Sequence, residues 1–313
     1  MFSKEFCNYI KGIAMFLIIM GHIVWFRESQ DWLFRLLKML FHQGDCGVNA
    51  FFFLSAYGLC YSYKKNTIMA FYKKRFLRIF PIYVLFVLLL FLLLPSVDNR
   101  SIPSLLLLQL SGLTVLEDNT IIEWFVPALI LLYLLFPIIY RLMCMMKNWK
   151  GSICLYMVLL TGLIPLFYMG VDHVHPYFLA RWSAIFVGIM CYIHGKEDEK
   201  IALSLLIFCA SLSLFSYQDC KFYFLIPLLI YALSLLDFEH LPLKRLMLFM
   251  GNYSLEIYLG QMIGLFWYYC NAGGSVWIDL LVGISISAIS AVLFYNVQKY
   301  FWVLVDLIPV HKR

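Results

Sequence analysis

The chain has 313 residues, of which 63% are hydrophobic and only 13% are charged. Soluble domains carry about 25% charged residues, so this composition excludes an ordinary soluble domain. Apolar runs of about 17–25 residues recur along the chain and are continuous rather than alternating, which indicates membrane helices and not a strand barrel. Basic loops on one side of a membrane explain the net charge of +6, and we expect no nucleic-acid partner.

These features predict an all-α, polytopic membrane helical bundle that forms a single domain over residues 1–313. Most of the 24 lysine and arginine residues fall on one side if the N-terminus is cytoplasmic. Because cytoplasmic loops are enriched in such residues, we expect both termini in the cytoplasm. About ten transmembrane helices are expected, in chain order 8–26, 47–63, 79–95, 121–140, 152–170, 176–194, 201–216, 222–236, 248–269 and 276–302.

The first span contains a lysine and a histidine, in the stretch KGIAMFLIIMGHIVWF that begins at Lys11. Each helical residue turns by about 100°, so Lys11 and His22 share one face and lie about 16 Å apart along the axis. An ionisable group inside a membrane is costly and usually functional. His22 is therefore a candidate functional group, with a hydrogen-bonded packing histidine as the alternative. Lys11 could likewise be a snorkelling residue that only sets the topology.

Two polar features follow the first span. Residues 27–45 have charged side chains at helical spacing among aromatic and aliphatic ones, which predicts an interfacial helix lying flat on the outer surface. A basic cytoplasmic segment, 64–78, then leads into the third span. Within it Arg75 and Arg78 lie three residues apart, so they share a helix face, and guanidinium groups suit phosphate or pyrophosphate. The alternative is that this segment only anchors the topology.

Two carboxylates are candidates for assisting an imidazole. Glu123 lies at the outer end of the fourth span, where it could orient a histidine at a similar depth, or could be an interfacial acid beside Trp124. Glu256 lies within the ninth span, and a buried glutamate needs a cationic or hydrogen-bonding partner. The nine cysteines show neither zinc nor disulfide spacing, and we expect no metal.

Six stretches resemble, in order, motifs of the acyltransferase 3 family of integral membrane acyltransferases, and the resemblance spans about residues 8–300. Each motif is weak alone, but six in the right order are fairly specific. Four residues depart from the family pattern: Lys11 stands where arginine is commoner, Asn49 replaces aspartate, Ala56 replaces glycine and Gln261 replaces histidine. The six stretches are YIKGIAMFLIIMGHI, GVNAFFFLSAYGL, FYKKRFLRIFPIY, EWFVPALILLY, RWSAIFVGIMCY and GNYSLEIYLGQ.

The resemblance implies a membrane O-acyltransferase, usually an O-acetyltransferase, of the bacterial cell membrane. Such enzymes move an acyl group from cytoplasmic acyl-CoA, here expected to be acetyl-CoA, to a hydroxyl of a cell-surface polysaccharide or a lipid-linked sugar. By the same resemblance His22 occupies the catalytic position and Lys11 the position of its basic partner. Arg75 and Arg78 correspond to the basic pair on the donor side.

A mechanism follows as a hypothesis. Lys73 and Lys74 would join the arginines in binding the CoA phosphates, and the pantetheine arm would bring the thioester to His22. The imidazole would act as general base or carry the acyl group briefly, and Glu123 or Glu256 would fix its tautomer.

Three other functions stay open at this point. A transporter or flippase of a glycan or lipid-linked intermediate would line a pathway with the same charges, although no inverted repeat is visible. A glycan polymerase or ligase would call for larger outer loops. A membrane acyltransferase of another class is disfavoured only by the order of the motifs.

Overall fold

A computed structural model describes residues 2–26, 28–93, 124–146, 148–168, 177–195, 198–215, 221–237, 243–270 and 275–307, with isolated positions between 104 and 111 and at 240. Every regular element within these ranges is a helix, and none of the described residues lies in a strand. The prediction of an all-α protein is therefore confirmed.

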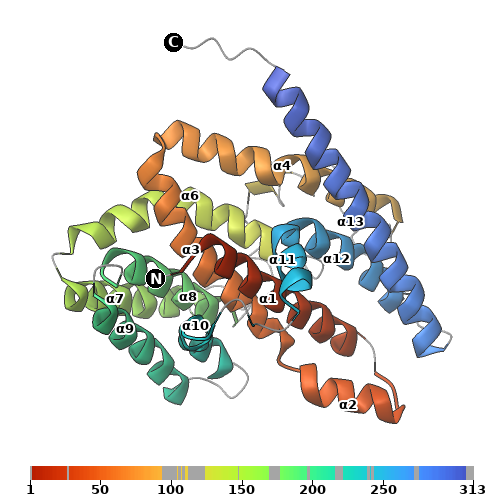
Figure 1. Ribbon diagram of the computed structural model, residues 1–313, viewed down its shortest axis with the longest axis horizontal. Coiled ribbons are helices and arrows are strands. Elements are labelled where there is room, and N and C mark those ends of the chain that lie inside the picture. Colours follow the sequence, from red (N-terminus) through yellow and green to blue (C-terminus); the bar gives the residue numbers. More distant parts are fainter. Residues whose placement is uncertain are drawn as a thin grey trace.

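Figure 1 shows the order of the helices, with α1 near the centre and α13 along one edge. Both the predicted interfacial helix and the predicted spans correspond to helices of the structure. The elements are α1 (Lys4–Trp25), α2 (Trp32–Phe41), η1 (Gly44–Cys46), α3 (Gly47–Lys65), α4 (Ile68–Leu93), α6 (Phe125–Met145), α7 (Trp149–Tyr168), α8 (Tyr177–Ile193), α9 (Glu199–Ser211), η3 (Leu212–Phe215), α10 (Lys221–Ser234), α11 (Lys244–Asn252), α12 (Ser254–Cys270) and α13 (Val276–Leu307).

In the described part of the chain, four helices are long and apolar enough to cross a membrane: α1, α4, α6 and the portion Val276–Val303 of α13. Shorter apolar helices cover Trp149–Leu159, Arg181–Ile193 and Phe222–Ser234. The four long helices thus have the length and apolar character that crossing a membrane requires, whereas the count of ten spans and the cytoplasmic placement of both termini stay predictions.

Two expected elements differ from the sequence prediction. The ninth span, 248–269, is divided into α11 and α12 at Tyr253, where Gly251 and Asn252 are poor helix formers. The basic segment before the third span is helical, because α4 already begins at Ile68 and meets no glycine or proline before Pro81. Lys73, Lys74, Arg75 and Arg78 therefore all lie on α4, whereas Lys64 and Lys65 belong to the last turn of α3.

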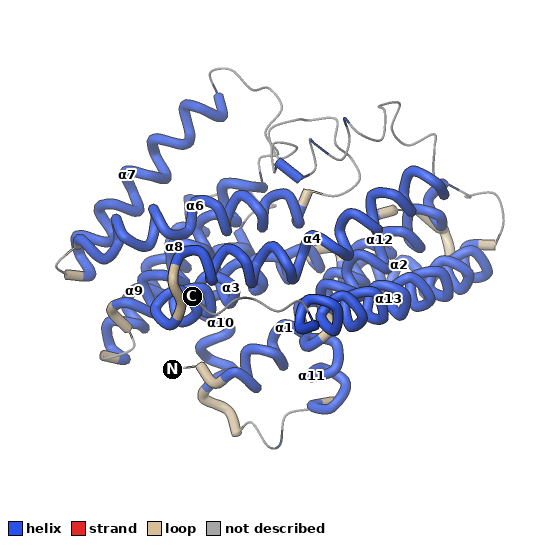
Figure 2. The backbone as a smooth tube through the Cα atoms, turned by 90° about the horizontal axis from the view of Figure 1, so that it is seen from above, coloured by secondary structure: helices blue, strands red, loops and turns tan. Residues whose placement is uncertain are grey.

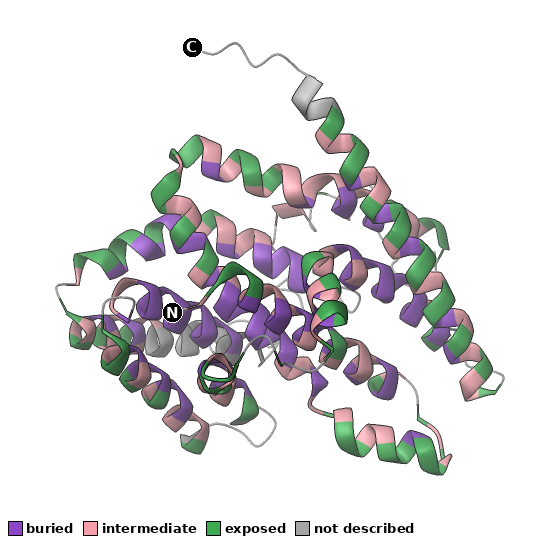
Figure 3. Cartoon of the chain, viewed as in Figure 1, coloured by how far each residue is buried: buried purple, intermediate pink, exposed green. Residues whose placement is uncertain are grey.

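The core is built around α1, which contacts α2, η1, α3, α11 and α12. Figure 3 shows much of α1 and α3 as buried, while α13 is buried along only one side. Seen from above in Figure 2, α7 and α13 lie at opposite edges of the molecule. A side chain buried on α1 is consequently enclosed by several elements at once.

Glycines allow α1 and α11 to cross in direct backbone contact. A Cβ atom added to Gly12 would overlap the carbonyl group of Met247, and one added to Gly251 would overlap the carbonyl of Asn8. The α12–α13 pair uses the same device, because a Cβ on Gly264 would overlap the Gly283 carbonyl. Small residues of this kind permit close helix packing inside membranes, where apolar contacts alone give little driving force.

We expect Gly12→Ala to lower the thermal unfolding temperature of the detergent-solubilised protein by several degrees, because the added methyl group has no space. Gly58→Ala is the matched control, since Gly58 is also helical but nothing lies within 4 Å of its added Cβ. That control should be neutral or stabilising by about 0.5–1 kcal/mol. Equal unfolding temperatures for the two variants would contradict the proposed crossing.

Candidate active site

A strongly basic cavity of about 640 Å³ lies between α1, α3, α4, α6, α11, α12 and α13. Apolar and aromatic side chains such as Phe125, Tyr133 and Trp302 form much of its wall, together with uncharged polar residues such as Asn8 and Ser55. This combination suits a large anionic ligand that also has apolar or aromatic parts. The charged side chains among the described residues that line it are Lys4, Lys11, Arg75, Arg78, Lys299 and Glu256.

Glu256, the one acidic side chain among the described residues of this lining, is held in a bidentate ion pair. Arg78 Nη1 lies 2.5 Å from Glu256 Oε1, and Arg78 Nη2 lies 3.0 Å from Glu256 Oε2. The glutamate side chain is 3% exposed and the arginine side chain 35% exposed. The pair joins α4 to α12, and Gln298 joins α13 to α4 by donating to the Leu77 carbonyl at 3.0 Å. One wall of the cavity is therefore fixed by polar contacts.

Two other cations in the cavity are not neutralised in this way. The Arg75 guanidinium lies 5.6 Å from the ring centres of both Phe71 and Tyr133. Its buried Nε atom has no hydrogen-bond partner among the described residues. Lys11 forms no ion pair with any residue that the structure describes. Both groups retain donors for an incoming anion, and arginine in particular suits phosphate oxygens.

The predicted donor-binding residues thus divide into two groups. Lys11, Arg75 and Arg78 line the cavity, whereas Lys73 and Lys74 are exposed and do not. Lys74 Nζ instead donates to Asn66 Oδ1 at 2.7 Å. Helical periodicity turns Lys73 well away from the face that carries Arg75 and Arg78. Lys74 lies four residues before Arg78, at the edge of that face, and it is the contact with Asn66 that holds its ammonium group outside the cavity.

Two lysines that line the cavity, Lys4 and Lys299, were not singled out from the sequence. Lys4 lies seven residues before Lys11, on the same face of the helix, so its spacing could have indicated it. Lys299 lies on α13, some 200 residues after α4. Only the packing of these two helices brings it to the cavity, and no local pattern could have indicated that.

His22 continues the cavity-lining face of α1. The residues of this helix that reach the cavity are Lys4, Asn8, Lys11, Met15 and Ile18, at alternating spacings of four and three. The next position in that series is 22. Met15 is 1% exposed and Ile18 2% exposed, so buried apolar side chains separate the basic cavity from the imidazole.

Gln261 of α12 is the hydrogen-bond partner of His22, with its Nε2 atom 3.1 Å from His22 Nδ1. The imidazole also stacks on Phe26, with ring centres 5.3 Å apart. Glu256 is engaged with Arg78 instead, and Glu123 lies outside the described residues. The sequence analysis noted Gln261 only as a departure from the family pattern, although a polar residue in a buried face was itself a signal.

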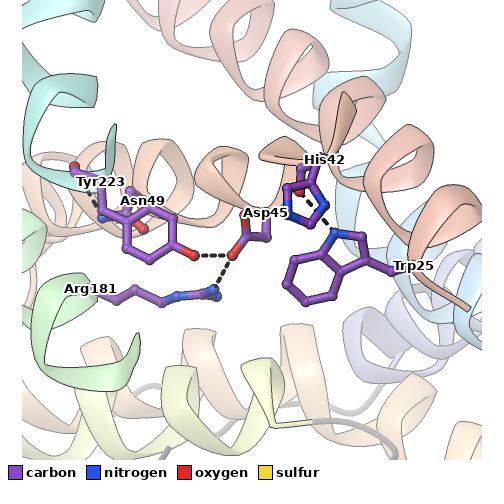
Figure 4. Close-up of polar contacts among 6 residues, drawn as sticks. All are labelled: Trp25, His42, Asp45, Asn49, Arg181 and Tyr223. Atoms are coloured by element: carbon purple, nitrogen blue, oxygen red, sulfur yellow. Dashed lines mark hydrogen bonds and ion pairs between the residues drawn. The ribbon is translucent and has the colours of Figure 1, made fainter. Parts of the chain in front are cut away.

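A second polar cluster is formed by Asp45, Arg181 and Tyr223 (Figure 4). Arg181 Nη2 lies 2.9 Å from Asp45 Oδ2, and the Tyr223 hydroxyl donates to the same carboxylate oxygen. The Arg181 guanidinium also lies 4.3 Å from the centre of the Trp124 ring. The backbone of η1, which carries Asp45, packs directly against Gly21, the residue before His22. Sequence reasoning assigned this cluster no role.

The thiol beside this cluster is not a competing nucleophile. Burial and the neighbouring Asp45 charge raise the pKa of Cys46 to about 11, so its reactive thiolate form is scarce at neutral pH. Among the residues that the structure describes, no group of three or more His, Cys, Asp and Glu side chains is arranged to hold a metal ion. Of the residues placed here, His22 is thus the best suited to accept a proton.

Residues 5–296 match the family model of the acyltransferase domain, which is that of the acyltransferase 3 family. The chain belongs to the acyltransferase 3 family. No curated protein and no solved structure matches it. As a member of this family the protein is a membrane acyltransferase, and the basic cavity and His22 are the features on which that activity can be placed.

The Arg78–Glu256 pair gives a prediction about stability in this acyltransferase. Arg78→Met leaves a buried carboxylate without its partner, and we expect it to cost about 3 kcal/mol. The double variant Arg78→Met/Glu256→Met removes both charges and should unfold at a higher temperature than Arg78→Met alone. Thermal unfolding in detergent measures this, with Lys73→Met as an exposed control. Additive losses in the double variant would show that the pair is not coupled.

Proposed function

We propose that the protein is an O-acyltransferase of the bacterial cell membrane that transfers an acyl group, most simply acetyl, from acyl-CoA to a hydroxyl of a cell-surface or lipid-linked glycan. The observation that supports this most is the placement of Lys11 and His22 on one face of α1. Lys11 lines the basic cavity, and His22 lies about 16 Å farther along the helix. One helix thereby connects a site for an anion with a proton acceptor.

The cavity has the chemistry that a CoA donor requires. CoA has phosphate groups at one end and a long, nearly neutral pantetheine arm that ends in the thioester. Lys11, Arg75 and Lys299 would contact the phosphates, while Arg78 is already engaged by Glu256. The arm would extend along the α1 face toward His22. Because Met15 and Ile18 are buried there, we expect their side chains to move when the donor binds.

The transfer step needs one base and no redox chemistry. In this proposal Nε2 of His22 takes the proton of the acceptor hydroxyl as its oxygen attacks the thioester carbonyl carbon. The C–S bond of the tetrahedral intermediate then breaks, and the CoA thiolate leaves with the proton from the imidazolium. The acyl group remains on the acceptor oxygen as an ester. The Arg181–Asp45 cluster beside His22 would favour negative charge on the intermediate through the guanidinium.

The experiment that tests this function is label transfer in inverted membrane vesicles. Radiolabelled acetyl-CoA is supplied, with succinyl-CoA in parallel, and label is counted in the glycan and lipid-linked sugar fractions. We expect label in the wild type and its loss in His22→Ala at equal protein level. His240→Ala is the matched control, because the His240 side chain is 83% exposed. Label that persists in His22→Ala would overturn the mechanism, and glycan transport without CoA release would favour a transporter.

A second prediction separates the cavity cations from the exposed ones. Arg75→Gln and Lys11→Met should raise the KM for acyl-CoA at least about tenfold, since each removes a charge-assisted contact worth about 1.5–3 kcal/mol. Lys73→Met and Lys74→Met, on the same helix as Arg75 but outside the cavity, should change KM less than twofold. Initial rates over a range of donor concentrations measure this. Equal effects of all four substitutions would mean that the charge of the whole surface, and not the cavity, binds the donor.

A further inference from the structure

We propose that Gln261 is a positioning residue that selects the reactive tautomer of His22 by accepting a hydrogen bond from Nδ1–H. This inference rests on the proposed function, because it assigns His22 the role of a base. Gln261 does not touch substrate in this account, and it acts only through the imidazole.

The contact is partly buried, and neighbouring groups hold both partners in place. Gln261 is 2% exposed, and its amide lies 3.1 Å from Nδ1 of His22, which is of intermediate exposure. One residue before Gln261, Gly260 brings α12 against the backbone of α13 at Ser287 and Ala291. Phe26 stacks on the imidazole ring. Helix packing thus fixes where the amide lies, while rotation of the amide itself remains possible.

The orientation of the amide decides which imidazole nitrogen can act as a base. With Gln261 Nε2 facing Nδ1, the amide donates, so the proton of a neutral imidazole must lie on Nε2. A half-turn of the amide brings its oxygen to Nδ1, which then donates and leaves Nε2 with a free lone pair. Once Nε2 has taken a proton, both ring nitrogens carry a hydrogen, so Nδ1 needs a hydrogen-bond acceptor. Only this second arrangement, with the amide oxygen at Nδ1, provides one.

Little opposes that half-turn. Gln261 Oε1 is buried and has no hydrogen-bond partner among the described residues. Each orientation therefore makes one hydrogen bond to His22 and leaves one amide atom without a partner. The demand for a base at Nε2 then selects the orientation with the carbonyl at Nδ1.

A neutral partner suits the charges that surround His22. Asp45 lies on η1, against the turn of α1 that carries His22, and it forms an ion pair with Arg181 of α8. This pair already places one charge of each sign near the site. An amide fixes the tautomer without adding another buried charge, whereas a carboxylate at the same position would stabilise the imidazolium.

The test compares two substitutions at this position with one elsewhere. Gln261→Leu removes both hydrogen-bonding groups, and Gln261→Glu retains only acceptors. Asn296→Leu is the matched control, because the Asn296 amide donates to the Val292 carbonyl of its own helix at 3.0 Å and does not line the cavity. All are assayed as the full chain in membrane vesicles, with kcat, KM and the pH profile of kcat measured at equal protein level.

We expect Gln261→Leu to lower kcat about 10–100-fold with little change in KM, since a misplaced tautomer removes general-base catalysis. Gln261→Glu should keep at least a tenth of the wild-type kcat. The acidic limb of its pH profile should move upward by about one unit, because the carboxylate favours the imidazolium. Wild-type kcat and an unmoved pH profile in Gln261→Leu would overturn the inference. Equal loss in the Glu and Leu variants would also overturn it, because the donating amide would then be the active form.

A measurement that needs no activity separates this inference from the proposed function. Nitrogen NMR of the ¹⁵N-histidine-labelled protein reports which imidazole nitrogen carries the proton, and the His22 signal is assigned by its absence from His22→Ala. We expect the Nδ1–H form in the wild type and its loss in Gln261→Leu. The Nε2–H form in both proteins would overturn the role of Gln261, whatever the assay shows. An Nδ1–H signal in a protein without transfer activity would leave the contact standing and overturn the function.

Discussion

The site depends on the enclosure of α1 by its neighbours. Gly12 and Gly251 let α11 cross α1 in backbone contact, and η1 packs against Gly21 nearer the other end. Because Lys11 and His22 lie on one continuous helix that is packed at both positions, the distance between them along the axis is set by the helical rise and not by the conformation of a loop. Every other part of the site is placed relative to this helix: the cations of α4 lie beside its first half and Gln261 of α12 beside its second.

Charged groups in the site are either paired or exposed to the cavity. The paired groups connect helices, whereas the groups exposed to the cavity are available to a ligand. Arg78 with Glu256 and Arg181 with Asp45 are ion pairs with at least one buried member. Burying such charges without partners would cost several kcal/mol each. Lys11 and Arg75 face the cavity without a carboxylate partner among the described residues. The cavity therefore keeps an excess of positive charge that an anionic donor can neutralise.

The sequence could predict what depends on local periodicity. The shared face of Lys11 and His22, the paired positions of Arg75 and Arg78 and the helix that follows the first span all arise from helical spacing within one segment. The same rule places Lys73 on the far side of α4 from Arg75, but it does not exclude Lys74, which lies four residues before Arg78. Lys74 donates to Asn66, in the turn between α3 and α4, and helical spacing alone does not indicate that contact.

Contacts between distant segments could not be predicted in this way. Glu256 was expected to need a cation, yet only the packing of α12 against α4 shows that the cation is Arg78. The same holds for Gln261 and His22, which lie 239 positions apart, and for Asp45 with Arg181. Each of these residues has several possible polar partners at a similar depth of the membrane. The composition of the spans therefore does not indicate which partner it contacts.

Two of the departures from the family pattern become physically intelligible in this arrangement. Asn49 is buried and donates through Nδ2 to the Tyr223 carbonyl at 3.2 Å, a bond that an ionised aspartate, having no donor, could not make. The carboxylate in that region comes instead from Asp45, which binds Arg181 and the Tyr223 hydroxyl. At Gln261 an amide likewise stands where the family more often has an ionisable side chain. In both places a neutral amide makes the contact, and the charged pair that the structure describes in this region is Asp45 with Arg181. In the proposed mechanism His22 would then be the group of this region whose charge changes during transfer, as a base inside a membrane requires.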